Sequence, residues 1–128
     1  MKNLSKSKVQ LPAAVADAVG WALEKNSLDP VLLDVRGLCS YADFLLVLGG
    51  RSGRQVRAIA ETIRRGMRND GHRTLGSEGT DEGRWVLLDY GEVVVHVFLD
   101  ELRDFYDLES LWVEAPRLSM NVPSKAAP

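Results

Sequence analysis

The strongest constraint on the fold of this chain is the alternation of short apolar runs with amphipathic segments. Four runs of five or six residues are rich in Val, Leu and Phe and are bounded by glycine or turn residues, which is typical of buried strands. These runs are Val31–Val35, Phe44–Leu48, Trp85–Asp89 and Val93–Phe98. Segments with helical spacing lie before, between and after them. The pattern predicts an α/β fold in which one mixed, partly antiparallel sheet has helices packed on it.

The helix predicted between Ser52 and Gly71 has the clearest signals in the chain. Ser52 and Gln55 have the spacing of a capping box, and Gly71 is a stop signal. One face carries an apolar stripe, and the opposite face is rich in arginine with only Glu61 to offset it. The arginines of that face are Arg54, Arg57, Arg64, Arg65 and Arg68. This helix therefore carries most of the positive charge of the first half of the chain.

Two further helices and a hairpin complete the predicted domain. The first helix has Pro12 near its first turn, where the missing N–H costs nothing, and it ends near Asn26. The last two strands flank Tyr90–Glu92, which is the pattern of a tight hairpin. A last short helix has Asp100 as its candidate N-cap and continues to Trp112.

The length of 128 residues fits one hydrophobic core, which we place at residues 11–112. We expect a flexible N-terminus at residues 1–10 and a disordered tail at residues 113–128, because neither shows a periodic apolar pattern. Cys39 is the single cysteine and cannot form an internal disulfide, which suits a reducing compartment. No stretch approaches the roughly 18 apolar residues that cross a bilayer, so we expect a cytoplasmic protein without membrane contact.

The net charge of −2 conceals an uneven distribution of charge along the chain. Residues 1–76 carry 12 Lys or Arg against 7 Asp or Glu, a balance of +5, whereas residues 77–128 carry 4 against 11, a balance of −7. The net value argues against a strongly basic nucleic-acid binder. The asymmetry is a statement about partners rather than about fold.

The turn from Gly49 to Arg54 joins a strand to a helix N-terminus and is a candidate anion site. Arg51, Ser52 and Arg54 would hold the anion with the help of free amides and the helix dipole. The spacing fits neither a P-loop nor G-x-G-x-x-G, and any tight strand-to-helix turn requires glycine. We therefore favour a structural role and keep a nucleotide-binding or nucleotidyltransferase-like enzyme as the alternative function.

Other catalytic or metal chemistry has little support in the sequence. His72 and His96 are the only histidines, and neither has a second His or Cys at ligand spacing. Cys39 has no adjacent cation that would lower its pKa. We predict no metal site, no cofactor and no catalytic residue.

The strand from Trp85 to Asp89 resists a purely structural interpretation. Alternation places Trp85, Leu87 and Asp89 on one face of the sheet. Exposed apolar side chains rimmed by Glu78, Asp81 and Asp89 would have the composition of an interface hot spot for a basic partner. Trp85 can equally be a residue that caps the core, and the sequence does not separate the two.

A series of motifs in a fixed order resembles a known family. The motifs are Val35–Leu38 with Tyr41–Phe44, Gly50–Val56, Glu78–Gly79 with Trp85–Gly91, Val94–Phe98, and Phe105–Trp112. Together they resemble the ribosomal silencing factor family, also called Iojap-like, over roughly residues 11–112. Several motifs in the right order are far more specific than any one alone.

The resemblance implies a topology like that of nucleotidyltransferases but without their activity. Such enzymes need paired carboxylates in an Asp-x-Asp arrangement on a strand. Here Asp89 has Leu87 two residues before it and Gly91 two residues after it. The residues therefore agree with the resemblance that this chain is not an enzyme.

The resemblance also implies a partner and a mode of action. Members bind the universal protein fourteen of the large ribosomal subunit, block joining of the small subunit and repress translation when nutrients are scarce, and organellar relatives act in large-subunit assembly. Carried onto this sequence, the contact falls on the strand around Trp85, with weaker candidates at its rim. The residues are Trp85, Leu87, Leu88 and Asp89, then Glu78, Asp81 and Tyr106.

Two further partners stay open at this stage. The arginine face of the 52–71 helix is a candidate for peripheral contact with ribosomal RNA, or for an RNA-binding module in its own right. An uncovered sheet edge or the Trp85 patch would permit a homodimer of the free protein.

Overall fold

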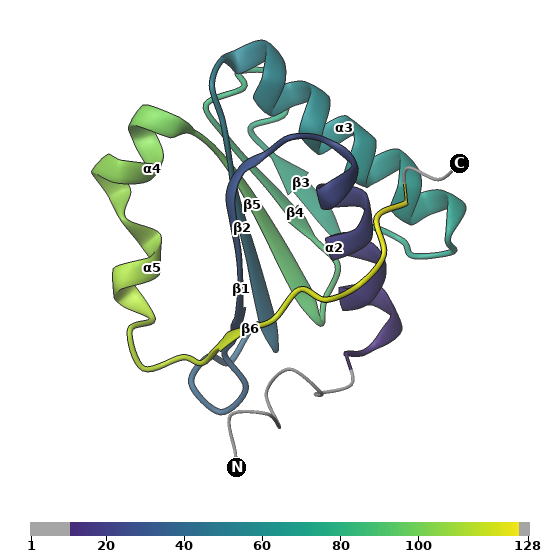
Figure 1. Ribbon diagram of the computed structural model, residues 1–128, viewed down its shortest axis with the longest axis vertical. Helices are drawn as coiled ribbons and strands as arrows, with labels where there is room; N and C mark the ends of the chain where they lie inside the picture. The colour runs from purple at the N-terminus through teal and green to yellow at the C-terminus, as the bar shows by residue number, and fades with distance from the viewer. Residues whose placement is uncertain (1–10, 126–128) are drawn as a thin grey trace.

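A six-stranded mixed sheet forms the centre of the structure, a computed structural model that describes residues 11–125 (Figure 1). The helices are α2 (Ala13–Glu24), α3 (Gly53–Asn69), α4 (Asp100–Tyr106) and α5 (Leu108–Leu111). The strands are β1 (Leu28–Asp34), β2 (Phe44–Gly50), β3 (Gly76–Glu78), β4 (Trp85–Asp89), β5 (Val93–Leu99) and β6 (Arg117–Leu118). The N-terminus predicted to be flexible, residues 1–10, lies outside the described part of the chain.

The strands lie in the order β3-β4-β5-β2-β1-β6. β2 and β5 are parallel, and every other neighbouring pair is antiparallel, which confirms the predicted mixed sheet. All seven residues of β2 are buried, as expected for a central strand covered on both faces. Because β2 and β5 are parallel neighbours, the chain between them must cross over, and it does so through α3, β3 and β4.

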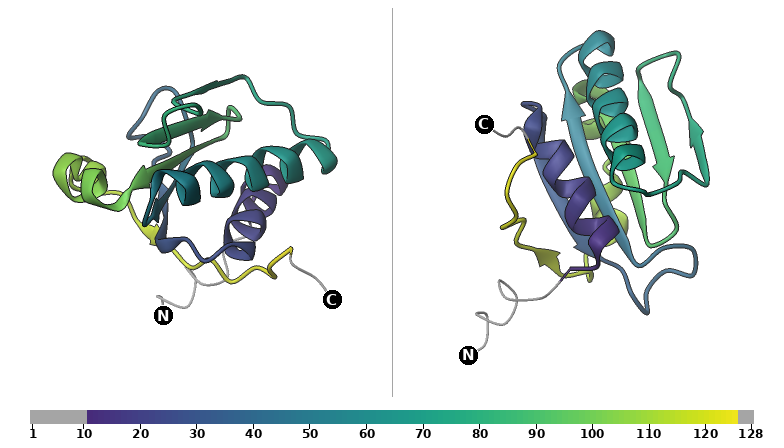
Figure 2. Two further views of the ribbon diagram at one scale, coloured as in Figure 1. Left: turned by 90° about the horizontal axis from the view of Figure 1, so that it is seen from above. Right: turned by 90° about the vertical axis from the view of Figure 1, so that its right-hand side faces the viewer.

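The two faces of the sheet are covered unequally (Figure 2). α2 and α3 lie together on one face and enclose the larger core, which includes Leu46, Ile59, Ile63 and Val95. α4 contacts β5 and β2, and α4 and α5 lie on the side away from α2 and α3 (Figure 1). The smaller core on that side includes Leu33, Leu45, Val94 and Ala115. The second face therefore has little helical cover, and it is left partly open at β4.

The start of α3 confirms the predicted capping box. The Ser52 hydroxyl accepts a hydrogen bond from the Gln55 backbone N–H at 3.1 Å, and the Gln55 amide oxygen accepts one from the Arg51 backbone N–H at 2.6 Å. Three of the apolar positions along this helix are fully buried, namely Val56, Ile63 and Met67. The arginine side faces away from the core, as its pattern predicts.

The single last helix predicted from Asp100 to Trp112 is in fact two short helices. Asp107 adopts φ 47°, a left-handed conformation that aspartate tolerates better than most residues, and this ends α4. Asp100 lies in the first turn of α4 and not at its N-cap, which is Leu99. The break allows a side chain of α4 to pair with one of α5.

The prediction of a disordered tail at residues 113–128 is wrong for residues 113–125. β6 pairs antiparallel with β1 through Leu32↔Leu118 and Leu33↔Arg117, and Leu118 is buried. A strand of two residues is too short to show an alternating apolar pattern in the sequence. It forms because the edge of β1 offers free backbone groups for pairing. Residues 126–128 lie outside the described part.

The segment after β6 is held by ion pairs beside α2. The Lys125 ammonium lies 3.0 Å from an Asp17 carboxylate oxygen and 3.4 Å from one of Asp70. The other Asp17 oxygen lies 2.8 Å from His72 Nε2. Burial alone would raise the pKa of Asp17, but the hydrogen bonds with His72 and Lys125 outweigh it and lower that pKa. These contacts join the C-terminal segment to α2 and to the end of α3.

Close packing of α2 on α3 depends on Gly66, and this generates a prediction. A Cβ at this position would overlap the indole of Trp21, whose N–H donates to Asp70 at 2.8 Å. Gly66→Ala should lower the free energy of unfolding by about 2 kcal/mol, because overpacking outweighs the better helix propensity of alanine. Urea unfolding measures the change.

Gly53→Ala is the matched control for that measurement. Its added methyl group would meet nothing closer than 3.6 Å, so it should leave stability within about 0.5 kcal/mol of the parent. Equal stability of the two variants would contradict the proposed contact between the helices.

Candidate functional site

The partly open sheet face on β4 is built by alternation and register. Trp85 and Leu87 are partly exposed on this face, and the residues between and after them, Val86 and Leu88, are fully buried under α2 and α3. Glu78 on β3 pairs with Leu87, so its side chain lies on the same face. An apolar strip with an acidic neighbour therefore lies near the β3 edge of the sheet.

Trp85 is held by aromatic contacts on two sides. Its ring stacks on Phe98 of β5 with centroids 4.6 Å apart, and it lies 5.1 Å from the ring of Tyr106 on α4. Its indole N–H donates to His96 Nδ1 at 3.1 Å. These contacts fix the ring in one orientation while leaving part of it exposed, so Trp85 is both a packed residue and a surface residue.

His96 is a buried neutral residue beneath this strip. It is 5% exposed, and burial lowers its pKa to about 4. Because Nδ1 accepts the hydrogen bond of Trp85, the ring proton resides on Nε2. Nε2 has no hydrogen-bond partner among the described residues. The histidine therefore orients Trp85 and stays unprotonated near neutral pH.

A cavity of about 440 Å³ lies over this strip. It is bounded by β4, by the segment that follows β3 and by α4. Its lining residues are Glu78, Gly79, Glu82, Arg84, Trp85, Leu87, Leu102 and Tyr106. Four of the residues predicted to contact a partner thus come together at one concavity, although they lie on three different elements.

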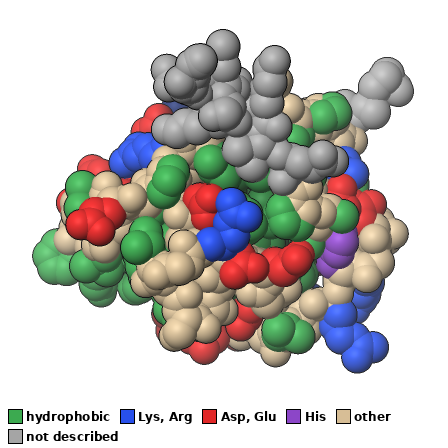
Figure 3. Space-filling view, turned by 90° about the horizontal axis from the view of Figure 1, so that it is seen from below, with side chains coloured by type: hydrophobic (Ala, Val, Ile, Leu, Met, Phe, Trp, Pro, Cys, Tyr) green, Lys and Arg blue, Asp and Glu red, His purple; other side chains and the backbone are tan. Residues whose placement is uncertain are grey.

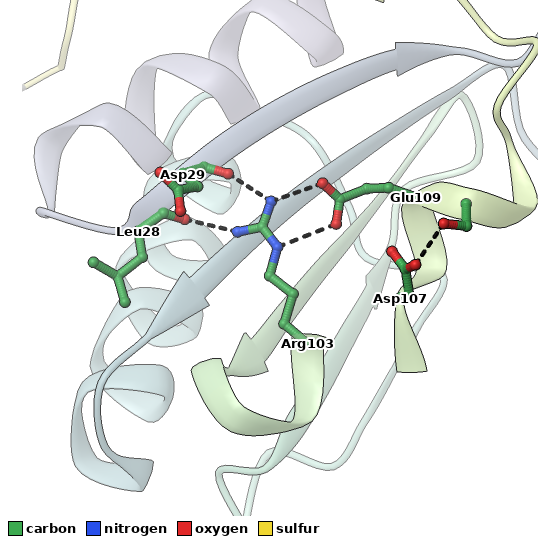
Figure 4. A network of polar contacts seen from close by, with 6 residues as sticks. Leu28, Asp29, Arg103, Asp107 and Glu109 are labelled. Carbon is green, nitrogen blue, oxygen red and sulfur yellow. Dashed lines mark hydrogen bonds and ion pairs between the residues drawn. The ribbon is translucent and has the colours of Figure 1, made fainter. Parts of the chain in front are cut away.

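Arg103 fastens α4 and α5 to the sheet (Figure 4). It is 7% exposed, and its guanidinium makes two hydrogen bonds to the Glu109 carboxylate, at 3.2 and 3.1 Å. Nη1 donates to the Leu28 carbonyl at 2.9 Å, and Nη2, which also donates to Glu109, donates to the Asp29 carbonyl at 2.6 Å. These carbonyls are at the bulge of β1, where Asp29 has φ 42°. Gly49 leaves room for the guanidinium, which would lie 3.3 Å from a Cβ there.

Three of the predicted contact residues have other roles or positions. Leu88 faces the larger core and is fully buried, so it cannot touch a partner and is removed from the set. Asp89 is partly buried, and its carboxylate accepts a hydrogen bond from the Gly91 backbone N–H at 2.8 Å, which closes the hairpin turn. Asp81 is exposed in the loop before β4 and does not line the cavity.

The structure adds surface residues that the sequence did not single out as contacts. Leu102 lines the cavity, and Phe105 lies edge-on to Tyr106 with centroids 5.1 Å apart. Phe105, Leu111 and Val113 are 77%, 72% and 82% exposed. Figure 3 shows hydrophobic side chains gathered at the left-hand edge, over α4 and α5. In the sequence Leu102, Phe105 and Leu111 recur at helical spacing, a pattern that does not distinguish an exposed apolar surface from a buried one.

Capping hydrogen bonds at the start of α3 stabilise the Gly49–Arg54 turn. The Gln55 side chain and the Ser52 hydroxyl and carbonyl accept from the backbone N–H groups of Arg51, Gln55 and Val56. A Cβ at Gly50 would lie 2.8 Å from the Val56 side chain, so close packing explains this glycine. Arg51 and Arg54 are exposed and do not line the cavity over the β4 strip. The arrangement favours the structural role of the turn.

Within residues 11–125, no group of three or more His, Cys, Asp or Glu side chains is placed to hold a metal ion. None of the helices in the same range is long and apolar enough to cross a membrane.

The similarity to known proteins extends over most of the chain and is not limited to one motif. The family model described as ribosomal silencing factor during starvation matches residues 8–128. The ribosomal silencing factor RsfS of Bacillus subtilis is 41% identical over 111 residues, which cover 87% of this chain and 89% of that protein.

Two further similarities extend this comparison. A crystal structure of a Chromobacterium violaceum protein is similar with a TM-score of 0.78 and 34% identity, covering 92% of this chain and 98% of that one. The mouse protein named mitochondrial assembly of ribosomal large subunit protein 1 is 28% identical over 92 residues, covering 70% of this chain and 40% of that protein.

The buried His96 predicts a pH dependence of stability. Its pKa falls from 6.5 in the unfolded chain to about 4 in the folded one, so between these values only the unfolded chain binds the proton. The free energy of unfolding should therefore decrease as the pH is lowered through this window, by roughly 3 kcal/mol in total. Urea unfolding at several pH values measures the loss.

His96→Gln keeps an acceptor for the Trp85 indole but cannot titrate, so most of the loss attributed to His96 should disappear in this variant. His72→Gln removes the other histidine, and this variant should still show the loss of stability at low pH. Asp17 and Asp34 have lowered pKa values, so their contributions are lost mainly below the unfolded value of 3.8, outside the window. An unchanged loss in His96→Gln would refute the assignment.

Arg103 supplies a second prediction for this site. Arg103→Met leaves Glu109 and two carbonyls without their partner, so it should lower the free energy of unfolding by about 3 kcal/mol. It should also speed amide hydrogen exchange in residues 100–111, because α4 and α5 lose their attachment. Arg65→Met removes an exposed arginine paired with Glu61 at 3.2 Å and should cost less than about 1 kcal/mol. Equal losses in the two variants would contradict the role of Arg103.

Proposed function

Because the chain belongs to the ribosomal silencing factor family, we propose that it binds the large ribosomal subunit and blocks joining of the small subunit. The contact is made with the universal protein fourteen of the large subunit, through the face around Trp85. Occupation of that face excludes the small subunit by steric overlap, so translation is repressed under nutrient limitation. The action needs no reaction at the site.

The observation that carries the proposal is the partly exposed Trp85 held rigidly beside an acidic rim. Aromatic side chains in fixed orientations bind with little further loss of conformational entropy, and tryptophan is enriched among residues that dominate binding energy. Glu78 and Glu82 at the cavity supply negative charge, with Arg84 as the one cation lining it. Such a surface is complementary to a basic protein rather than to RNA.

Exposed apolar side chains on α4 and α5 extend this contact surface. Phe105 and Tyr106 are 77% and 50% exposed, and Tyr106 lies between Phe105 and Trp85 in a chain of ring contacts. Leu111 and Val113 continue the apolar character toward the end of α5. The hydrogen bonds of Arg103 to Leu28 and Asp29 hold α4 and α5, here called the α4–α5 arm, against the sheet. Arg103 therefore positions Tyr106 without touching the partner itself.

A role in large-subunit assembly is the second part of the proposal. The mouse relative is named for assembly of the mitochondrial ribosomal large subunit, and the same docking face would serve both actions. We also propose that the protein acts in the cytoplasm. Homodimerisation of the free protein through the Trp85 face would compete with ribosome binding.

The alternative of a nucleotide-using enzyme has less support. The Arg51 N–H of the Gly49–Arg54 turn donates to the Gln55 side chain, and the Asp89 carboxylate closes a hairpin. A nucleotidyltransferase-like topology without the catalytic carboxylates is therefore part of the proposal. Calorimetry with nucleoside triphosphates and magnesium tests the alternative, which requires binding that is lost when Arg51 or Arg54 is substituted.

The central experiment mixes purified protein with isolated ribosomal subunits and separates the mixture on a sucrose gradient. The protein should migrate with the large subunit, and its presence should reduce the yield of joined ribosomes. Migration with neither subunit, or undiminished joining at saturating protein, would refute the proposal.

Trp85→Ala should weaken binding to the large subunit by about 2 kcal/mol or more, which is roughly a thirtyfold rise in Kd. Trp21→Ala removes the same side chain from the opposite side of the sheet and should leave Kd within about twofold. Circular dichroism and urea unfolding establish that both variants fold. If the two substitutions weaken binding equally, the partner does not dock on the Trp85 face.

A further inference from the structure

A second concave site lies at the end of α3, away from the Trp85 face. It is a cavity of about 440 Å³ between the last turns of α3 and the loop at residues 71–74 that leads to β3. Four arginines line it, namely Arg64, Arg65, Arg68 and Arg73, together with Glu61 and Thr74. Figure 3 shows Lys and Arg side chains beside a histidine at the right-hand edge, which is the α3 side of the molecule in Figure 1.

Most of the positive charge in this cavity is uncompensated. Glu61 is the single carboxylate of the lining, and it is shared between Arg65 at 3.2 Å and Arg64 at 3.8 Å. Within residues 11–125, no carboxylate lies within 4.0 Å of Arg68 or Arg73. The neighbouring His72 is engaged by Asp17 at 2.8 Å. Two guanidinium groups are thus available to an incoming anion, and two more are only partly neutralised.

Stabilisation of the helix end does not account for this cluster. A cation in the last turn interacts favourably with the helix dipole, which explains Arg68. Arg73 lies beyond the helix, after the glycine that ends it, and still points its charge to the same concavity. Like charges placed together without carboxylates repel one another, so the arrangement costs energy unless an anion joins it.

The residues that line the cavity indicate which class of anion it would bind. Guanidinium groups match phosphate oxygens with paired hydrogen bonds, and the Thr74 hydroxyl adds another donor. No Trp, Tyr or Phe lines the cavity, so nothing there would stack on a base. One small phosphate would leave several of the four guanidinium groups unused. A chain of phosphates would engage more of them.

We propose that this arginine pocket binds the backbone phosphates of an RNA strand without regard to base sequence. It would supply a second contact with the large subunit, to RNA, beside the protein contact at Trp85. The inference rests on the proposed function for the identity of that RNA, but binding of RNA by the pocket is testable on its own.

The test measures binding of the full chain to a labelled single-stranded RNA of about 20 nucleotides at salt concentrations from about 50 to 200 mM. Arg68→Gln with Arg73→Gln should weaken binding roughly tenfold or more near 0.1 M salt. It should also reduce the slope of log K against log salt by about 1.4, since two phosphate contacts are lost. Both side chains are exposed, so the fold should be unaffected.

Arg51→Gln with Arg54→Gln is the matched control, because it removes the same charge from two exposed arginines at the other end of α3. This control should retain most of the affinity and slope. Equal weakening in the two double variants would refute the proposal that the pocket binds RNA, because it would show only a general effect of positive charge. Binding that neither double variant changes would overturn it as well.

Competition with inorganic triphosphate separates the two sources of phosphate. RNA should bind more tightly than triphosphate at equal phosphate concentration, and the reverse order would replace RNA by a free polyphosphate. Trp85→Ala should not change RNA binding. If the proposed function fails, the gradient experiment fails while RNA binding persists; if the pocket fails, only the salt-dependent RNA binding is lost.

Discussion

The parallel pairing of β2 with β5 is the constraint on which the rest of the structure depends. Every residue of β2 is buried, so this strand needs neighbours on both sides and cover on both faces. Because parallel strands cannot be joined by a short turn, the chain must leave the sheet and return, and α3 makes that crossing. The crossing also brings β3 and β4 to one edge, where Trp85 lies. Both proposed binding sites therefore follow from one connection.

The Trp85 site shows how a buried polar group can orient a surface residue. His96 is kept neutral by burial, and a neutral ring can accept the indole hydrogen bond at Nδ1. Phe98 and Tyr106 then restrict the remaining freedom of the indole ring. Tyr106 depends in turn on Arg103, which connects α4, α5 and the bulge of β1. A surface prepared in this way loses little further entropy when a partner docks.

The charge asymmetry of the chain becomes a separation in space. The acidic half surrounds the hairpin and the α4–α5 arm, and the basic half is concentrated on the outer side of α3. The Trp85 face is suited to a basic protein, and the arginine pocket is suited to phosphate. A protein that docks on a ribosomal subunit meets both kinds of surface. The net charge of −2 describes neither site.

The sequence by itself determined the elements whose signals are local. Apolar period, capping residues and glycine stops predicted α2, α3 and four strands, and ordered motifs identified the family. Tertiary structure alone decided the rest, because the missing information is pairing between distant segments. The short edge strands β3 and β6 exist only where a neighbouring strand offers free backbone groups, and Asp107 breaks the last helix where Arg103 meets Glu109. Alternation placed Trp85 and Leu87 on one face, but only packing showed that Leu88 is inaccessible and that Arg73 joins the arginines of α3.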